Sequence, residues 1–136
     1  MTTAWVAWVD ANVLLRVLTK EPPDLAGRAR ALMARVDRGD LLLLVPVVVI
    51  AEVVWVLASR YGYSRGEIAI ALQPFVSADG IRVEGDEAVS EALALMSEKN
   101  VDFVDAYLAA VAAKRREPIA TFDADFKRLG AQVLAI

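Results

Sequence analysis

Acidic side chains that end or interrupt apolar segments are the residues of this sequence best suited to chemistry. Asp10 and Asp123 each follow a short apolar segment rich in β-forming residues, and Glu52 is the only charged residue in the apolar segment 47–57. Gathered carboxylates repel one another unless a cation neutralises them. Because oxygen ligands without imidazole or thiolate suit hard cations, these acids predict a Mg²⁺ or Mn²⁺ site.

The composition excludes many other kinds of site. The chain of 136 residues contains no cysteine and no histidine, so disulfide scaffolds, zinc fingers and His-dependent triads are excluded. Hydrophobic residues make up 57% of the chain, which is enough for the core of a single domain spanning residues 1–136. The net charge of −3 gives no general attraction to nucleic acid. An RNA partner would need a local basic patch or a bound metal.

Glu52 is the most informative of these acids. No orientation of a helix over 47–59 can bury its valines and also leave the segment well solvated. We therefore expect the Glu52 carboxylate to be buried, with a cation, a hydrogen-bond partner or a raised pKa. The alternative to a metal or catalytic role is a structural ion pair with an arginine such as Arg16. We favour the metal or catalytic role, because isolated charges in apolar segments tend to mark sites.

Each of the other acids has a structural alternative when it is considered alone. Asp10 can be the N-cap of the following helix, and Asn12 has the same ambiguity. Asp123 can be a turn residue, with Asp125 capping a short helix after it. Their combination at strand ends favours a shared metal site over these separate roles.

Two further acids, Asp102 and Asp105, lie where a helix is expected to begin. Carboxylates favour the positive end of a helix dipole, so both residues suit the first turn. Spacing alone does not decide which of the two belongs to the acidic cluster.

Apolar periodicity predicts strands that alternate with helices along the whole chain. The expected strands are 5–9, 41–45, 81–83, 118–122 and 132–136. The expected helices are 12–18, 47–59, 86–99 and 102–116, with a helical turn at 125–129. Two more are expected, one capped by Asp24 and one that begins with a Ser64–Glu67 capping box. This alternation predicts an α/β fold, a three-layer α/β/α sandwich with a mainly parallel central sheet. The ligand crevice of such a sheet lies at the carboxyl ends of its strands, where Asp10 and Asp123 stand.

The sequence predicts no membrane span. The most apolar stretch, 41–58, is interrupted by Pro46 and Glu52, so two shorter buried elements explain it better. The first ten residues lack the basic start of a signal peptide. We expect a cytoplasmic protein.

Four segments of the sequence together resemble the PIN-domain family, and within it the VapC-type toxin endoribonucleases. These are WVDANVLL at 8–15, AEVVWVL at 51–57, DFVDAYLAA at 102–110 and TFDADF at 121–126. Each segment alone is weakly specific, but their order and approximate spacing agree over the whole chain. One departure is Ala11, where the family often has a threonine. The missing hydroxyl removes one contact to the residues around the metal site and leaves the implied metal ligands unchanged.

The resemblance implies a PIN-like fold and a catalytic quartet. The implied residues are Asp10, Glu52, Asp105 and Asp123 as the catalytic acids, with Asp10, Asp105 and Asp123 as metal ligands and Asn12, Thr121 and Asp125 in support. It also implies a Mg²⁺ or Mn²⁺ cofactor, hydrolysis of RNA, a cognate antitoxin that occludes the site, and a homodimer.

Three rival functions and several basic residues also fit parts of the sequence. A receiver-like signalling domain also binds Mg²⁺ in an α/β fold, but Asp10 has no adjacent acid. A non-catalytic interaction domain could keep the acids as a structural metal site. A phosphatase would use a D-x-D motif, which Asp123-Ala124-Asp125 matches loosely near the C-terminus. The arginines and lysines of 28–38 and 114–116 are interpreted as solvated faces, and Arg16 as the better candidate for a phosphate contact.

Overall fold

Parallel strands and helices alternate along the chain, as the apolar pattern predicts. The computed structural model describes residues 5–136. The strands are β1 (Trp5–Trp8), β2 (Leu41–Val45), β3 (Ile81–Val83), β4 (Ile119–Ala120) and β5 (Val133–Leu134). The helices are α1 (Ala11–Thr19), α2 (Pro23–Asp37), α3 (Val47–Ser59), α4 (Arg65–Val76), α5 (Asp86–Lys99), α6 (Phe103–Arg115) and the 3₁₀ helix η1 (Ala124–Leu129).

The main sheet contains three parallel strands in the order β1-β2-β3. Its central strand β2 has the sequence LLLLV, and its alternate residues Leu41, Leu43 and Val45 are 1–3% exposed. Helices flank this sheet, as parallel connections require. The α/β fold class with a parallel sheet is therefore confirmed.

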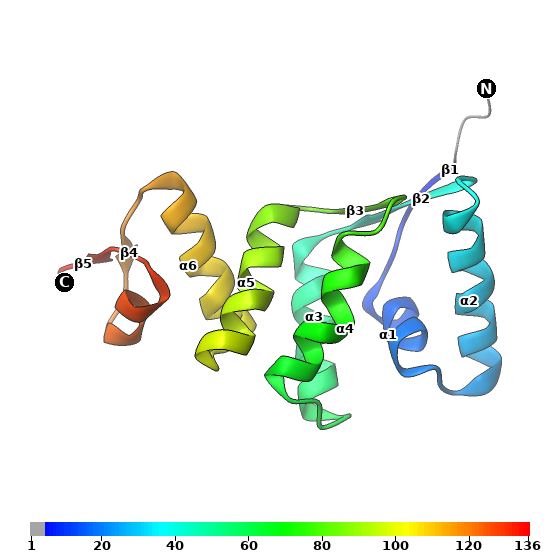
Figure 1. Cartoon of the computed structure of the whole chain (residues 1–136), viewed down its shortest axis with the longest axis horizontal. Helices are drawn as coiled ribbons and strands as arrows, with labels where there is room; N and C mark the ends of the chain where they lie inside the picture. The colour runs from blue at the N-terminus through cyan, green and yellow to red at the C-terminus, as the bar shows by residue number, and fades with distance from the viewer. Residues whose placement is uncertain (1–4) are drawn as a thin grey trace.

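The sheet is divided, which the sequence did not predict. Strands β4 and β5 pair in parallel with each other and form a separate two-stranded sheet. Figure 1 shows this pair at one end of an elongated molecule and β1 toward the other end. The two strand ends that carry Asp10 and Asp123 consequently belong to different sheets.

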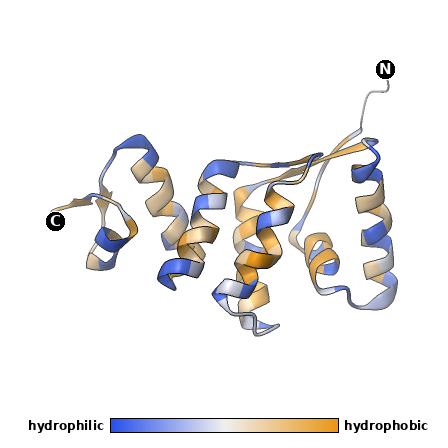
Figure 2. Ribbon diagram, in the orientation of Figure 1, coloured by the Kyte–Doolittle hydropathy of each residue, from blue (hydrophilic) through white to orange (hydrophobic). Residues whose placement is uncertain are grey.

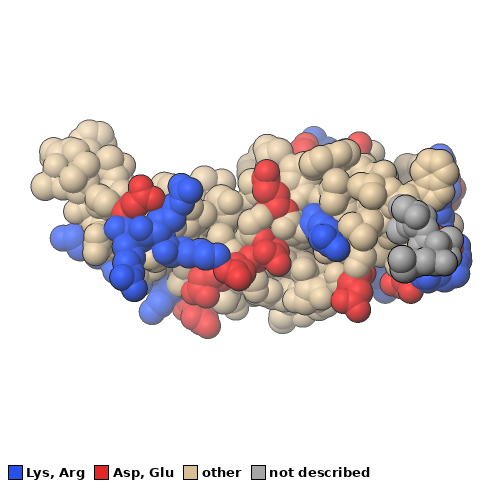
Figure 3. Space-filling model, turned by 90° about the horizontal axis from the view of Figure 1, so that it is seen from above, with Lys and Arg blue, Asp and Glu red and all other residues tan. Residues whose placement is uncertain are grey.

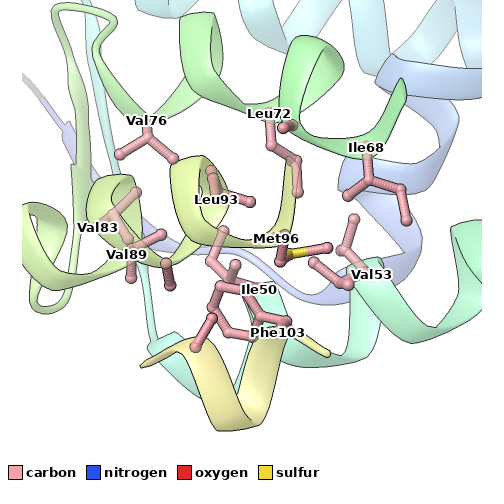
Figure 4. Close-up of a cluster of buried hydrophobic side chains, with 14 of the residues drawn as sticks. Ile50, Val53, Ile68, Leu72, Val76, Val83, Val89, Leu93, Met96 and Phe103 are labelled. Atoms are coloured by element: carbon pink, nitrogen blue, oxygen red, sulfur yellow. The ribbon is translucent and has the colours of Figure 1, made fainter. Parts of the chain in front are cut away.

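The core lies between β3 and helices α3, α4, α5 and α6. Figure 4 shows side chains from these elements converging on one another, among them Ile50, Leu93 and Phe103. Ile50 and Leu93 are fully buried and Phe103 is 4% exposed. The apolar faces of these helices meet there. Figure 2 shows both hydrophilic and hydrophobic residues along α5 and α6.

A reciprocal hydrogen-bonded pair joins α4 to α5 beside this core. Gln73 Nε2 donates to the Ser90 carbonyl at 2.9 Å, and Ser90 Oγ donates to Gln73 Oε1 at 3.0 Å. The half-buried amide and hydroxyl therefore satisfy each other.

Helix starts test the predicted caps. The Ser64–Glu67 capping box of α4 is confirmed. The predicted Asp24 cap is wrong, because α2 begins one residue earlier with Pro23, whose fixed φ suits the first helical position. The predicted Asp125 cap is also wrong, since Asp123 occupies that position and accepts the Asp125 amide at 2.8 Å.

The apolar stretch 41–58 is divided between β2 and α3 at Pro46, as expected. Among residues 5–136, no helix is both long and apolar enough to cross a membrane.

Candidate metal centre

Asp105 and Asp123 line the same small polar pocket, a cavity of about 170 Å³ between the start of α6 and η1. Asp125 and the basic residues Arg65 and Arg128 line it as well. The pocket thus combines several carboxylates with compensating guanidinium groups. It is the part of the described chain that most resembles the predicted acidic site.

Asp105 is held by the first turn of α6 and is half-buried. The positive end of the helix dipole stabilises a carboxylate at this position. Within residues 5–136 its side chain accepts no hydrogen bond and forms no ion pair. Its oxygens are therefore free to bind a cation.

Asp123 is exposed and lies at the turn between β4 and η1. Its amide donates to Thr121 Oγ1 at 3.0 Å, and its Oδ1 accepts the Asp125 amide at 2.8 Å. These two bonds fix the turn that carries the carboxylate. Thr121 thus contacts Asp123 through its hydroxyl, and Asp125 contacts it through its backbone amide.

Asp102 is distinguished from Asp105 by its partner. Its carboxylate forms an ion pair with Arg65, whose Nη1 also donates to the Asn100 carbonyl at 2.6 Å. Asp102 occupies the N-cap position of α6, but its side chain makes no capping hydrogen bond. Because Arg65 already neutralises Asp102, Asp105 is the acid left available in this turn.

Asp10 lies at the carboxyl end of β1, and its Oδ1 accepts the Val13 amide of α1 at 3.1 Å. The side chain is exposed, so it retains free oxygen positions. Asn12 follows it on α1 and lines a different pocket, between α1 and α2, together with Arg16. Asp10 and the pocket of Asp105 are therefore separate features of the described chain.

Arg16 serves the structure around α1. Its Nη1 donates to the Glu21 carbonyl at 2.7 Å, and its Nη2 donates to the Tyr61 hydroxyl at 3.4 Å. These bonds occupy the guanidinium, so the predicted phosphate contact of Arg16 has no support here.

The prediction that Glu52 is buried is wrong. Its side chain is exposed on α3, and within residues 5–136 it forms no ion pair with Arg16. Val48 and Trp55 lie on the same helical stripe, at i−4 and i+3, and are 69% and 63% exposed. The sequence argument assumed that this apolar face is covered, and nothing in the described chain covers it.

The four predicted acids are not assembled into one cluster within a single chain. Over the described range 5–136, no three acidic residues lie close enough together to hold a metal ion. The expected gathering of Asp10, Glu52, Asp105 and Asp123 in one cluster is therefore wrong for the described part of a single chain, because Asp10 and Asp123 follow strands of different sheets. The donor chemistry of Asp105 and Asp123 still fits Mg²⁺ or Mn²⁺, since it offers only oxygen ligands.

The basic side chains in the last turn of α6 lie away from the acidic pocket. Lys114 and Arg115 are in the last turn of α6, about 14 Å along the helix axis from Asp105 at 1.5 Å per residue. Figure 3 shows basic groups gathered toward the end of the molecule that carries β4 and β5 in Figure 1, with acidic groups beside them. Lys114 pairs with Glu87, which agrees with a solvated, mutually compensated surface.

Sequence reasoning missed Arg65, Arg128 and Glu84 as residues that organise this region. Arg65 compensates Asp102, and Arg128 Nη1 donates to the Lys99 carbonyl at 2.8 Å on the rim of the acidic pocket. Glu84 Oε1 accepts the Val47 amide at 3.1 Å and so caps α3. These partners are distant in sequence, so no local pattern indicated them.

The sequence matches the PIN domain over residues 7–132, which is most of the chain. A comparison with curated proteins found no match. The matched range contains both strand ends that carry acids and all the helices between them. This chain belongs to the PIN-domain family, a family of metal-dependent nucleases.

Proposed function

We propose that this protein is an endoribonuclease that hydrolyses RNA phosphodiester bonds with Mg²⁺ or Mn²⁺, and that it is the toxin of a toxin–antitoxin pair. The observation that carries the proposal is the pocket lined by Asp105 and Asp123, in a chain of the PIN-domain family. The resemblance of the four acidic segments to VapC-type toxins supports the choice of RNA as substrate.

Asp10, Asp105 and Asp123 would hold the cation through carboxylate oxygens. A bound Mg²⁺ or Mn²⁺ lowers the pKa of a coordinated water and stabilises charge on the phosphate. Asp105 is suited to this role because its carboxylate has no competing partner among the described residues. Thr121 and Asp125 would support the binding of the cation by fixing the turn that carries Asp123.

Glu52 is proposed to accept the proton of the attacking water. The water oxygen bonds to phosphorus while the bond from phosphorus to the leaving nucleotide oxygen breaks. Glu52 is exposed on α3 and forms no ion pair or hydrogen bond among residues 5–136, so its carboxylate is available to act as this base.

Purified protein, stripped of metal with EDTA, tests the nuclease proposal. Labelled single-stranded RNA, a hairpin RNA and a DNA of the same sequence are incubated without metal, with Mg²⁺ and with Mn²⁺. We expect internal cleavage of RNA only when metal is added back. Cleavage that persists in excess EDTA would contradict the metal mechanism. Intact RNA under every condition would favour a non-catalytic interaction domain.

The toxin role has a separate test. Induced expression of the wild-type chain should arrest bacterial growth, and the Asp105→Asn variant at equal abundance should not. A cognate antitoxin would then restore growth by occluding the site. Growth arrest by both variants would contradict an RNA-cleaving toxin.

A further inference from the structure

The outer edge of β1 is unpaired and apolar. Among residues 5–136, β1 pairs with β2 alone, because the sheet order is β1-β2-β3. Its residues Trp5, Val6 and Trp8 are 74%, 60% and 72% exposed. Strands of parallel sheets are normally buried on both faces, and open apolar edges bind further strands. This edge therefore lacks a neighbour.

The β4–β5 pair has the complementary deficit. Each of its strands has a partner on one side only. Around it Phe122, Leu134 and Ile136 are 95%, 48% and 69% exposed. A two-stranded sheet is marginally stable without further strands or a packed face. The pair is thus suited to extend another sheet.

Parallel pairing of β4 with β1 would provide a hydrogen-bonding partner for the free edge of each strand. It would also bring Asp10 and Asp123 close together. Both β1–β2 and β4–β5 are parallel, so the sheet β3-β2-β1-β4-β5 would be parallel throughout. The carboxyl ends of parallel strands meet at one edge, where Asp10 and Asp123 would then be neighbours. If these acids are level, Ala7 and Ala120 are level too, since each precedes its acid by three residues.

The chain's own β4 is poorly placed to make this pairing. β4–β5 and β1 lie toward opposite ends of the molecule, with helices α3 to α6 between them (Figure 1). Those helices share the buried core of Ile50, Leu93 and Phe103, so moving α6 and β4 across the molecule would open that core. A second copy can present its β4 without any such cost.

We propose that two copies of this chain exchange their β4–β5 pairs. β4 of each copy pairs in parallel with β1 of the other, which closes both open edges in a two-fold symmetric dimer. Each metal centre then takes Asp10 from one copy and Asp123, with Asp105 from the same pocket, from the other. The assignment of these centres to metal and RNA rests on the proposed function, whereas the strand exchange does not.

Introduced cysteines test the exchange, because the chain has no cysteine of its own. The double variant Ala7→Cys/Ala120→Cys places one thiol on β1 and one on β4. Level residues on adjacent strands have Cα atoms about 5 Å apart, within disulfide range. The control Ala7→Cys/Ala31→Cys moves the second thiol to an exposed position on α2. Both proteins are oxidised at low micromolar concentration and run on a non-reducing gel.

Exchange predicts that the Ala7/Ala120 variant becomes a covalent dimer while the Ala7/Ala31 control stays a monomer. A monomer with an internal disulfide would overturn the proposal, because it would show that β4 folds onto β1 of its own chain. No disulfide, or equal dimer formation in the control, would overturn it as well.

A second readout separates this inference from the nuclease proposal. Asp10→Asn and Asp123→Asn chains are refolded together at equal amounts and compared with wild type. Random exchange leaves one unsubstituted centre in each mixed dimer, so Mn²⁺-dependent cleavage should recover to about a quarter of the wild-type rate. Wild-type cleavage without recovery would overturn the exchange alone. Absent wild-type cleavage beside a covalent Ala7/Ala120 dimer would overturn the function alone.

Discussion

The region from β1 to α6 and the C-terminal segment, residues 117–136, contain acids of the candidate site but are stabilised very differently. In the first region a continuous core includes Leu57, Ile68 and Leu72, all fully buried. The C-terminal segment buries Phe126 and Leu129 of η1, but it exposes Phe122 and Ile136. Asp10 and Glu52 thus lie on elements that pack on a large buried core, whereas Asp123 lies on a segment with little buried surface of its own.

Asp10 should show the largest effect, because it has both a structural and a proposed metal role. Asp10→Asn keeps the α1 cap, since asparagine is an equally good N-cap, but removes a metal ligand. We expect RNA cleavage to fall by orders of magnitude with an unchanged melting temperature. Asp10→Ala should lose the same activity and, in addition, about 0.5–2 kcal/mol of stability. Thermal melts and Mn²⁺-dependent cleavage rates check both, and an active Asp10→Asn protein would contradict the role.

A pair of truncations compares the stability of the two regions directly. Leu57→Ala opens a cavity in the buried core and should cost about 2–5 kcal/mol of unfolding free energy. Phe122→Ala removes a side chain that is 95% exposed, so a single chain should lose almost nothing. If the exchanged dimer forms, Phe122→Ala should instead weaken association. Denaturant unfolding and light scattering over a range of protein concentrations distinguish the outcomes, and equal losses in both variants would contradict the contrast.

The smallest effect concerns acid stability of α4, within the first region. Hydrogen bonds from Ser64, the backbone one foremost, lower the pKa of Glu67 below its ordinary value of 4.5. The ionised group therefore contributes stability above that value, and the contribution is lost as the pH falls through the folded-state pKa. Glu67→Gln should remove this small contribution at neutral pH and change little at pH 3, so the stability of the variant should depend less on pH between these values. The free energy of unfolding, measured at steps of about one pH unit from pH 3 to pH 7, tests this prediction. A steeper acid loss in the variant would contradict it.

Local patterns predicted the elements of the first region closely. The expected bounds of β2, α3, β3 and α5 agree with the structure, because apolar runs there are ended by Pro46, Gly80 or a cap. The Ser64–Glu67 box could be predicted since both partners lie within one helical turn. The PIN-domain match then agrees with the resemblance carried by the acidic segments.

Long-range features could not be read from the same patterns. Strand order was assumed to be continuous, but pairing of β4 with β5 alone depends on how α6 packs, which periodicity does not encode. Glu52 was expected to be buried because its neighbours are apolar, yet its stripe with Val48 and Trp55 lacks a cover in one chain. The ion pair that distinguishes Asp102 from Asp105 is made with Arg65, a partner far away in sequence.

The matched variants Asp105→Asn and Asp102→Asn test most directly whether Asp105, in the pocket that it shares with Asp123, is required for RNA cleavage. Both substitutions remove one charge from the first turn of α6. Asp102→Asn should lose only its partly exposed ion pair with Arg65, about 0–1 kcal/mol of stability, and keep cleavage. Asp105→Asn should retain the fold, bind Mn²⁺ more weakly and cleave RNA slower by orders of magnitude. The measurement is the RNA cleavage rate of each variant over a Mn²⁺ titration. Loss of cleavage in Asp102→Asn with wild-type rates in Asp105→Asn would contradict the account.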